Sequence, residues 1–153
     1  MRRISSWSAG PPADTAVAAP ARAYFEDVVL HSVQETPAMT LTETHVALYS
    51  GLSQDPPADA GLVPELLPLC LTTGLGWRVP QPPLAVLAFM GFEWEVLQPV
   101  RVGDTIHSLA RTAVKRSMRE GGVIVEERQV INQRGEIVHR GRFTYLVAKR
   151  LPP

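Results

Sequence analysis

The chain has 153 residues with 15 basic and 15 acidic side chains, so its formal net charge at pH 7 is zero. This length is typical of a single domain, which can bury about two-thirds of its unfolded surface without disulfides or metals. The balanced charge argues against a dedicated nucleic-acid binder and against strong electrostatic adhesion to a membrane. No run of about 18 apolar residues is present, so we expect no transmembrane helix.

The first residues have the composition of a disordered tail. Residues 1–20 are rich in Ser, Pro and Ala and lack the apolar core of a signal peptide. We therefore predict a tail over residues 1–20 and one domain over residues 21–150. The single cysteine, Cys70, cannot form an internal disulfide, which makes a reducing cytoplasm the simplest compartment. Because Cys70 lies in an apolar run, it is predicted to be a small core residue.

The first predicted helix begins near residue 43. Thr40 and Glu43 have the spacing of a capping box, although Thr42 is an equally good cap. The helix runs through Leu52 and must end before Pro56, because the residue that precedes a proline is pushed out of the helical region. Asp55 is therefore expected at the start of a loop.

The second predicted helix covers residues 64–75 and is apolar nearly all round, which favours burial on all sides. An α-helix leaves its first four amides unpaired, so Pro68 costs no hydrogen bond only within the first turn. The helix should therefore begin close to Glu65. The free amides of Glu65, Leu66 and Leu67 would form a positive pole suited to a carbonyl oxygen or an anion.

The second half of the chain predicts an antiparallel sheet. Phe92, Trp94 and Val96 alternate with two glutamates, as in a half-buried strand. Three longer strands are expected at 105–116, 122–132 and 136–149, separated by hairpin turns at 121–122 and 132–135. Such a meander with one helix packed on it is an α+β fold.

The stretch from Thr40 to Asp55 resembles the opening motif of MaoC-like hydratases, the family of (R)-specific enoyl-CoA hydratases, which reads roughly T-x-T-E-A-D-I-V-x-F-A-x-L-S-G-D-x-N-P-x-H. Similar matches occur at 99–105 and 132–138, so the resemblance covers roughly residues 24–150. It implies the hotdog fold, in which an antiparallel sheet wraps one buried central helix. It also implies a dimer with acyl-thioester sites at the interface. The residues that match the opening motif are Thr40, Thr42, Glu43, Val46, Tyr49, Gly51, Leu52, Ser53 and Asp55.

The chain departs from this family at its histidine. The resemblance makes Asp55 the catalytic acid or base, but the position five residues later holds Ala60, and the following loop is short. His45 is a candidate replacement, with a solvated first-turn residue as the alternative. Asp59 is a candidate displaced acid, with a polar loop residue as the alternative.

Other candidates have a structural alternative as well. Tyr49 and Ser53 match motif positions and are predicted to bind substrate together with Glu65, Leu66 and Leu67. Core packing for Tyr49 and helix capping for Glu65 are the alternatives. The aromatic Trp77 and Trp94, with Arg78, would either wall an acyl tunnel or, in the aromatic case, pack in the core.

The remaining charged residues give no metal site. Ten basic and four acidic residues between 111 and 150 would contact coenzyme A phosphates or form a solvated sheet face. His31, His107 and His139 lack the spacing of zinc ligands and are predicted at the surface. We expect neither a metal nor a cofactor.

The sequence thus predicts a cytoplasmic, dimeric hydratase or dehydratase that acts on an acyl-CoA or acyl-carrier-protein thioester of fatty-acid or polyketide metabolism. Two alternatives remain open. One is a cyclase or isomerase of natural-product biosynthesis that keeps the cavity of the same fold. The other is a non-catalytic subunit that pairs with an active hydratase.

Overall fold

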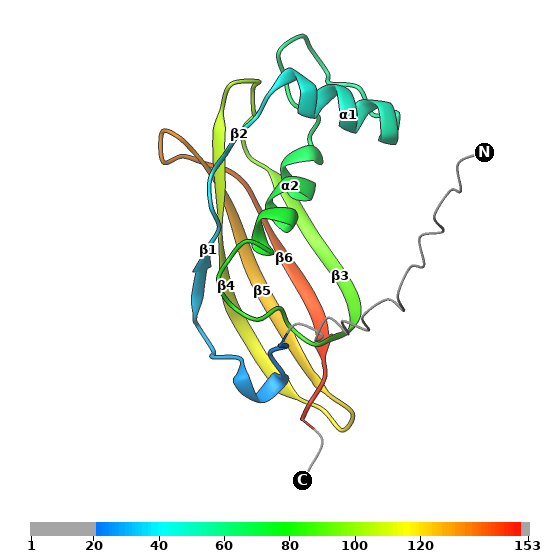
Figure 1. Cartoon of the computed structure of the whole chain (residues 1–153), viewed down its shortest axis with the longest axis vertical. Coiled ribbons are helices and arrows are strands. Elements are labelled where there is room, and N and C mark those ends of the chain that lie inside the picture. The colour runs from blue at the N-terminus through cyan, green and yellow to red at the C-terminus, as the bar shows by residue number, and fades with distance from the viewer. Residues whose placement is uncertain (1–20, 151–153) are drawn as a thin grey trace, which may run out of the picture.

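The structure is a computed structural model that describes residues 21–150, so the predicted tail at 1–20 lies outside the described residues. A short 3-10 helix is followed by two short strands, two α-helices and four long strands (Figure 1). Their bounds are η1 Phe25–Asp27, β1 Val33–Glu35, β2 Met39–Thr40, α1 Glu43–Ser53, α2 Leu67–Gly76, β3 Val86–Val96, β4 Thr105–Ser117, β5 Gly122–Asn132 and β6 Ile137–Val147.

The strands form one antiparallel sheet in the order β1-β4-β5-β6-β3. The short strand β2 pairs with β4 on the same edge as β1. The predicted meander is the β4-β5-β6 part of this sheet, with each strand close to its expected bounds. The helix α2 lies across one face of the sheet, and α1 lies at one end (Figure 1). The predicted α+β class is therefore confirmed.

Local capping explains where α1 begins. The hydroxyl of Thr42 accepts a hydrogen bond from the His45 amide at 3.4 Å, and Nδ1 of His45 accepts one from the Thr42 amide at 3.1 Å. Thr42 is therefore the cap, while the Thr40 hydroxyl bonds with that of Thr105 at 2.7 Å. Gln54 ends the helix in the left-handed region, with φ of 61°.

The sheet covers α2 on one face only. The helix begins at Leu67, two residues later than predicted, and Pro68 lies in its first turn as expected. Its buried residues are Leu67, Pro68, Thr72 and Leu75. Leu66 and Cys70 are exposed, so the predicted core position of Cys70 is wrong. The physical reason is that one sheet from one chain can cover only one side of the helix.

The hydrophobic core is divided into two clusters. The larger cluster packs beneath the start of α2, and the smaller one lies at the η1 end of the sheet. In the smaller cluster, Gly122 leaves the space that the Phe25 ring fills, since a Cβ there would be 1.9 Å from the ring. The buried members are Leu41, Val63, Leu67, Val100, Ile106, Val130 and Val138 in the first cluster and Phe25, Ile124 and Val147 in the second.

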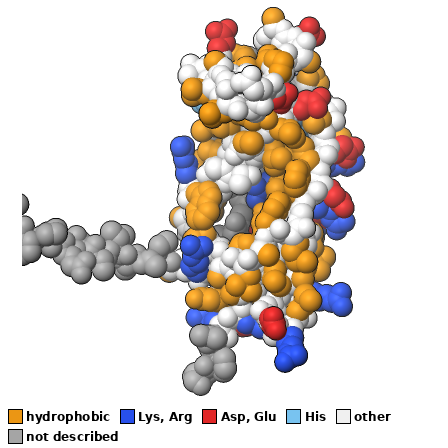
Figure 2. Space-filling model, turned by 90° about the vertical axis from the view of Figure 1, so that its right-hand side faces the viewer, with side chains coloured by type: hydrophobic (Ala, Val, Ile, Leu, Met, Phe, Trp, Pro, Cys, Tyr) orange, Lys and Arg blue, Asp and Glu red, His pale blue; other side chains and the backbone are white. Residues whose placement is uncertain are grey.

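The edge strand β3 is longer and more exposed than the alternation of residues 92–96 indicates. Its other edge pairs with no strand within residues 21–150. Figure 2, which looks at the side where β3 lies, shows hydrophobic side chains beside a hollow. The large hydrophobic residues of β3 that are at least one-third exposed are Val86, Leu87, Phe89, Met90, Phe92 and Val96.

Candidate active site

Asp55 is held by hydroxyl groups of α1. Its amide donates a hydrogen bond to Ser53 Oγ at 3.2 Å, and its carbonyl oxygen accepts one from Ser50 Oγ at 3.0 Å. The Tyr49 hydroxyl donates a longer bond of 3.4 Å to the Asp55 carboxylate. Burial and the nearby Asp55 charge raise the pKa of Tyr49, so the phenol stays protonated and acts as a donor. The half-buried Asp55 carboxylate is therefore fixed at the end of α1.

A pocket of about 820 Å³ opens between the end of α1 and the start of α2. Tyr49, Ser53 and Asp55 line it from the α1 side, and Glu65 and Leu66 from the α2 side. The structure thus brings together five of the seven predicted site residues.

Two backbone amides at the start of α2, beside this pocket, are left unpaired among the described residues. The amides of Glu65 and Leu66 have no hydrogen-bond partner within the described part of the chain. The Leu67 amide, by contrast, donates to the Pro64 carbonyl at 3.0 Å, and the Leu67 side chain is buried in the core. The prediction of three free amides therefore holds for two, because the turn before α2 uses the third.

His45 lies elsewhere. Its ring caps its own helix through Thr42 and is absent from the pocket lining. Ala60 and Asp59 are exposed and also lie outside the lining. The loop in which the family histidine is expected lines the pocket with Pro56 and Ala58, but position 60 itself does not line it.

A different histidine, His139 of β6, lines the Asp55 pocket. It is 1% exposed, so its predicted surface position is wrong. Burial lowers the pKa of His139 from 6.5 to about 4, which leaves the imidazole neutral at pH 7. Its ring meets Trp94 edge-on, with centroids 5.8 Å apart. A register shift in the β5–β6 pairing near His139 leaves both Val138 and His139 buried, and simple alternation along the strand does not predict this.

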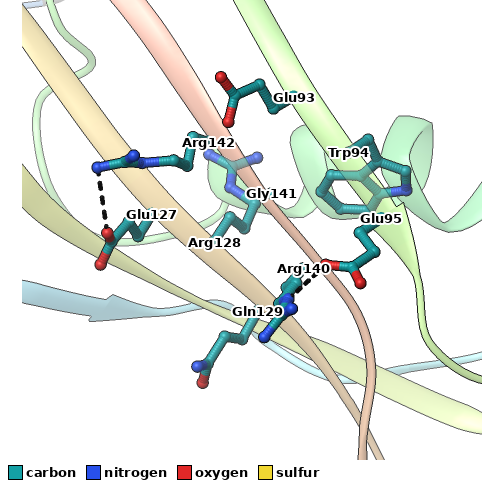
Figure 3. A pocket seen from close by; sticks show the side chains of 9 residues that line it. All are labelled: Glu93, Trp94, Glu95, Glu127, Arg128, Gln129, Arg140, Gly141 and Arg142. Atoms are coloured by element: carbon teal, nitrogen blue, oxygen red, sulfur yellow. Dashed lines mark hydrogen bonds and ion pairs between the residues drawn. The ribbon is translucent and has the colours of Figure 1, made fainter.

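Three arginines of the sheet form ion pairs on its other face. Figure 3 shows the pairs of Arg140 with Glu95, at 2.6 Å, and of Arg142 with Glu127, at 3.4 Å. Arg111 also pairs with Glu127, at 2.5 Å. These side chains form a cross-strand ladder of ion pairs, as expected of a solvated sheet face.

Neither a metal site nor a membrane-spanning helix is found among the described residues. No three His, Cys, Asp or Glu side chains of residues 21–150 lie close enough to hold a metal ion. In the same range, neither helix has the length and apolar composition needed to cross a membrane.

The sequence matches no family model and no curated protein. Solved structures do match. A monoamine oxidase regulatory protein from Archaeoglobus fulgidus is 26% identical, with 85% of this chain and 97% of that chain covered and a TM-score of 0.77. A MaoC-like dehydratase from Rhodospirillum rubrum is 17% identical, with 85% and 99% covered and a TM-score of 0.73. The R-hydratase PhaJ1 from Pseudomonas aeruginosa is 15% identical, with 85% and 94% covered and a TM-score of 0.68.

The fold and these comparisons define the class of the protein. It is a hotdog-fold protein whose structural neighbours are MaoC-like dehydratases and (R)-hydratases. The predicted hotdog fold and the resemblance to this group are confirmed.

Proposed function

We propose that this chain is a hydratase or dehydratase of acyl thioesters, carried on coenzyme A or on an acyl carrier protein, and that it acts in the Asp55 pocket. One observation carries the proposal. Asp55 and His139 line one pocket together with Glu65 and Leu66, whose backbone amides are unpaired among the described residues. These are the groups that the addition of water to an enoyl thioester needs.

Asp55 is the acid/base group of the proposed reaction. In hydration, the water oxygen bonds to the β-carbon, and the Asp55 carboxylate accepts the proton that the water loses. The α-carbon then takes up a proton from Asp55, and dehydration is the reverse. The neutral His139 ring takes the position of the missing family histidine by holding the water with a hydrogen bond. Tyr49 and Ser53 keep Asp55 in place.

The start of α2 stabilises the thioester oxygen. This oxygen gains negative charge as the bond to water forms. The amides of Glu65 and Leu66 lie at the positive end of α2 and can donate to it without reorganisation.

A second hotdog subunit completes the fold in this proposal. The free edge of β3 is apolar, the exposed face of α2 carries no charged residue, and an open hydrophobic edge strand invites pairing. A second copy of this chain, or a related hotdog subunit, would cover both surfaces.

The test is hydration of but-2-enoyl-CoA by the full chain. Asp55→Asn should lower the rate by about a hundredfold to ten-thousandfold, the usual contribution of an acid/base group. Asp59→Asn is the matched control, because Asp59 lies on the same loop outside the pocket lining, and it should keep the wild-type rate. Equal rates for Asp55→Asn and wild type would remove the proposed mechanism. Wild-type protein without activity would favour the non-catalytic subunit.

A further inference from the structure

The buried polar atoms without partners gather in one place. Within residues 21–150, five buried side-chain nitrogen or oxygen atoms have no hydrogen-bond partner, and they belong to Trp94, Ser108, Arg128 and His139. We call these four residues the inner polar band. Buried polar groups in native proteins are nearly always hydrogen-bonded, so a cluster of exceptions needs an explanation.

The inner polar band occupies two adjacent cross-strand rows beneath α2. In one row Ser108 is opposite Val130, which is opposite His139. In the next row Arg128 lies between Ala110 and Gly141, and Gly141 is opposite Trp94. Gly141 leaves the space that the Trp94 ring fills, because a Cβ there would lie 2.4 Å from that ring.

A second cavity, of about 880 Å³, lies at the C-terminal end of α2, on the side of the molecule where Figure 2 shows a hollow. Arg128, Glu126 and Tyr145 line it from the sheet, and Trp77 lines it from the end of α2. Its charged lining comprises three arginines, at 22, 128 and 150, and two acidic residues, at 27 and 126. One positive charge is thus left over when all five are ionised.

Arg128 has donor capacity that its neighbours do not use. The residue is 9% exposed, its Nη2 lies 3.4 Å from the Glu126 carboxylate, and the guanidinium stacks 4.7 Å from the centre of the Phe143 ring. Its Nε and Nη1 atoms are buried without an acceptor among the described residues. Burial raises the pKa of Tyr145 to about 12, so its hydroxyl remains a donor.

Contacting aromatic rings link the linings of the two cavities. His139 lines the Asp55 pocket and contacts Trp94, whose ring centroid lies 6.0 Å from that of Phe143. The Phe143 ring is in turn 6.4 Å from that of Tyr145, which lines the second cavity. The two cavities lie at opposite ends of α2, which spans about 15 Å at the usual rise per residue.

We propose that Arg128 of the inner polar band binds the far end of an acyl chain that carries hydrogen-bond-accepting oxygens, as ketone or carboxylate groups, beyond the thioester. An Arg side chain can only donate, so the ligand must supply the acceptor. A plain hydrocarbon chain would leave these donors unpaired. This inference rests on the proposed thioester function, because it assigns the rest of the same substrate.

The test compares three probes of equal chain length by isothermal titration calorimetry on the full chain. They are dodecanedioyl-CoA, 7-oxododecanoyl-CoA and dodecanoyl-CoA. At least one oxygenated probe should bind about tenfold or more tightly than dodecanoyl-CoA, the effect of one hydrogen bond to a charged group. The better oxygenated probe distinguishes a carboxylate from a ketone. Equal affinity for all three probes, or no binding, overturns the inference.

A variant pair assigns the preference to Arg128. The double change Glu126→Gln with Arg128→Met removes both charges together, so that no lone charge is left buried. It should abolish the preference for oxygenated probes and keep the affinity for dodecanoyl-CoA. Arg142→Gln, on the outer face, should keep the preference. A preference that survives the double change also overturns the inference. An oxygen preference without hydration of but-2-enoyl-CoA removes the proposed reaction alone, and hydration without that preference removes this inference alone.

Discussion

The missing histidine has two explanations: either only the side chain at position 60 has been replaced, or position 60 itself lies outside the pocket. If only the side chain were missing, restoring it would restore the pair of catalytic groups. Ala60 is exposed, however, and lies outside the pocket lining. We therefore expect Ala60→His to leave the rate of but-2-enoyl-CoA hydration unchanged within about twofold, because the new imidazole cannot reach the water. A tenfold gain would show that a side chain at position 60 does reach the pocket.

The buried His139 links stability to pH. Its pKa in the folded chain is about 4, below the ordinary value of 6.5, so folding favours the neutral ring. This stabilisation is fully present above pH 6.5 and is lost as the pH falls toward 4. Between pH 7.5 and pH 5 the wild type should lose about 2 kcal/mol more of its free energy of unfolding than His139→Gln. Urea unfolding of both proteins at the two pH values measures this difference, and an equal loss would contradict the buried neutral ring.

At the scale of elements, the cap of α1 is the clearest local determinant. Thr42 and His45 satisfy each other's amides, so Thr42→Ala should lower the free energy of unfolding by about 1 kcal/mol. Thr44→Ala, on an exposed position inside the same helix, is the control and should change it by less than about 0.5 kcal/mol. Urea titrations of both variants measure the effect. A larger loss of unfolding free energy for Thr44→Ala than for Thr42→Ala would show that Thr42 is not the cap.

Elements fixed by local chemistry are predictable from the sequence. The turn between β5 and β6 is an example, since Asn132 Oδ1 accepts hydrogen bonds from the amides of Arg134 and Glu136 at 2.9 and 3.1 Å. The short strands β1 and β2 are not predictable in this way. Val33 pairs with Arg111 far along the chain, so its strand exists only once β4 is present.

The same distinction applies to the site. Asp55, Tyr49 and Ser53 lie in one continuous motif and are held by bonds within it, so the sequence identifies them together. His139 reaches the pocket through strand pairing, which no local pattern shows. Glu126 and Arg128 can be identified from the sequence as unusual buried charges. They occupy alternate positions of a long strand, on the same face as the buried Ile124 and Val130.

At the scale of the whole molecule, assembly is the main expectation. We expect a dimer, or a multiple of one, at micromolar concentration in light scattering, because β3 leaves a long apolar edge open. Charges at Leu87 and Met90 (Leu87→Lys with Met90→Lys) should shift the protein to monomer. Val33→Lys, on the exposed opposite edge strand, is the control and should leave the dimer intact. A stable wild-type monomer would contradict pairing of two subunits through the free edge of β3.

The most direct test of the account follows the atoms of the reaction. The full chain is incubated with but-2-enoyl-CoA in heavy water, and the product is analysed by mass spectrometry and proton NMR. We expect a 3-hydroxybutanoyl-CoA with one deuterium on its α-carbon, formed at a rate that Asp55→Asn lowers by about a hundredfold or more. A labelled product formed equally fast by Asp55→Asn, or no hydroxyacyl product from the wild type, would contradict the assignment of hydratase chemistry to the Asp55 pocket.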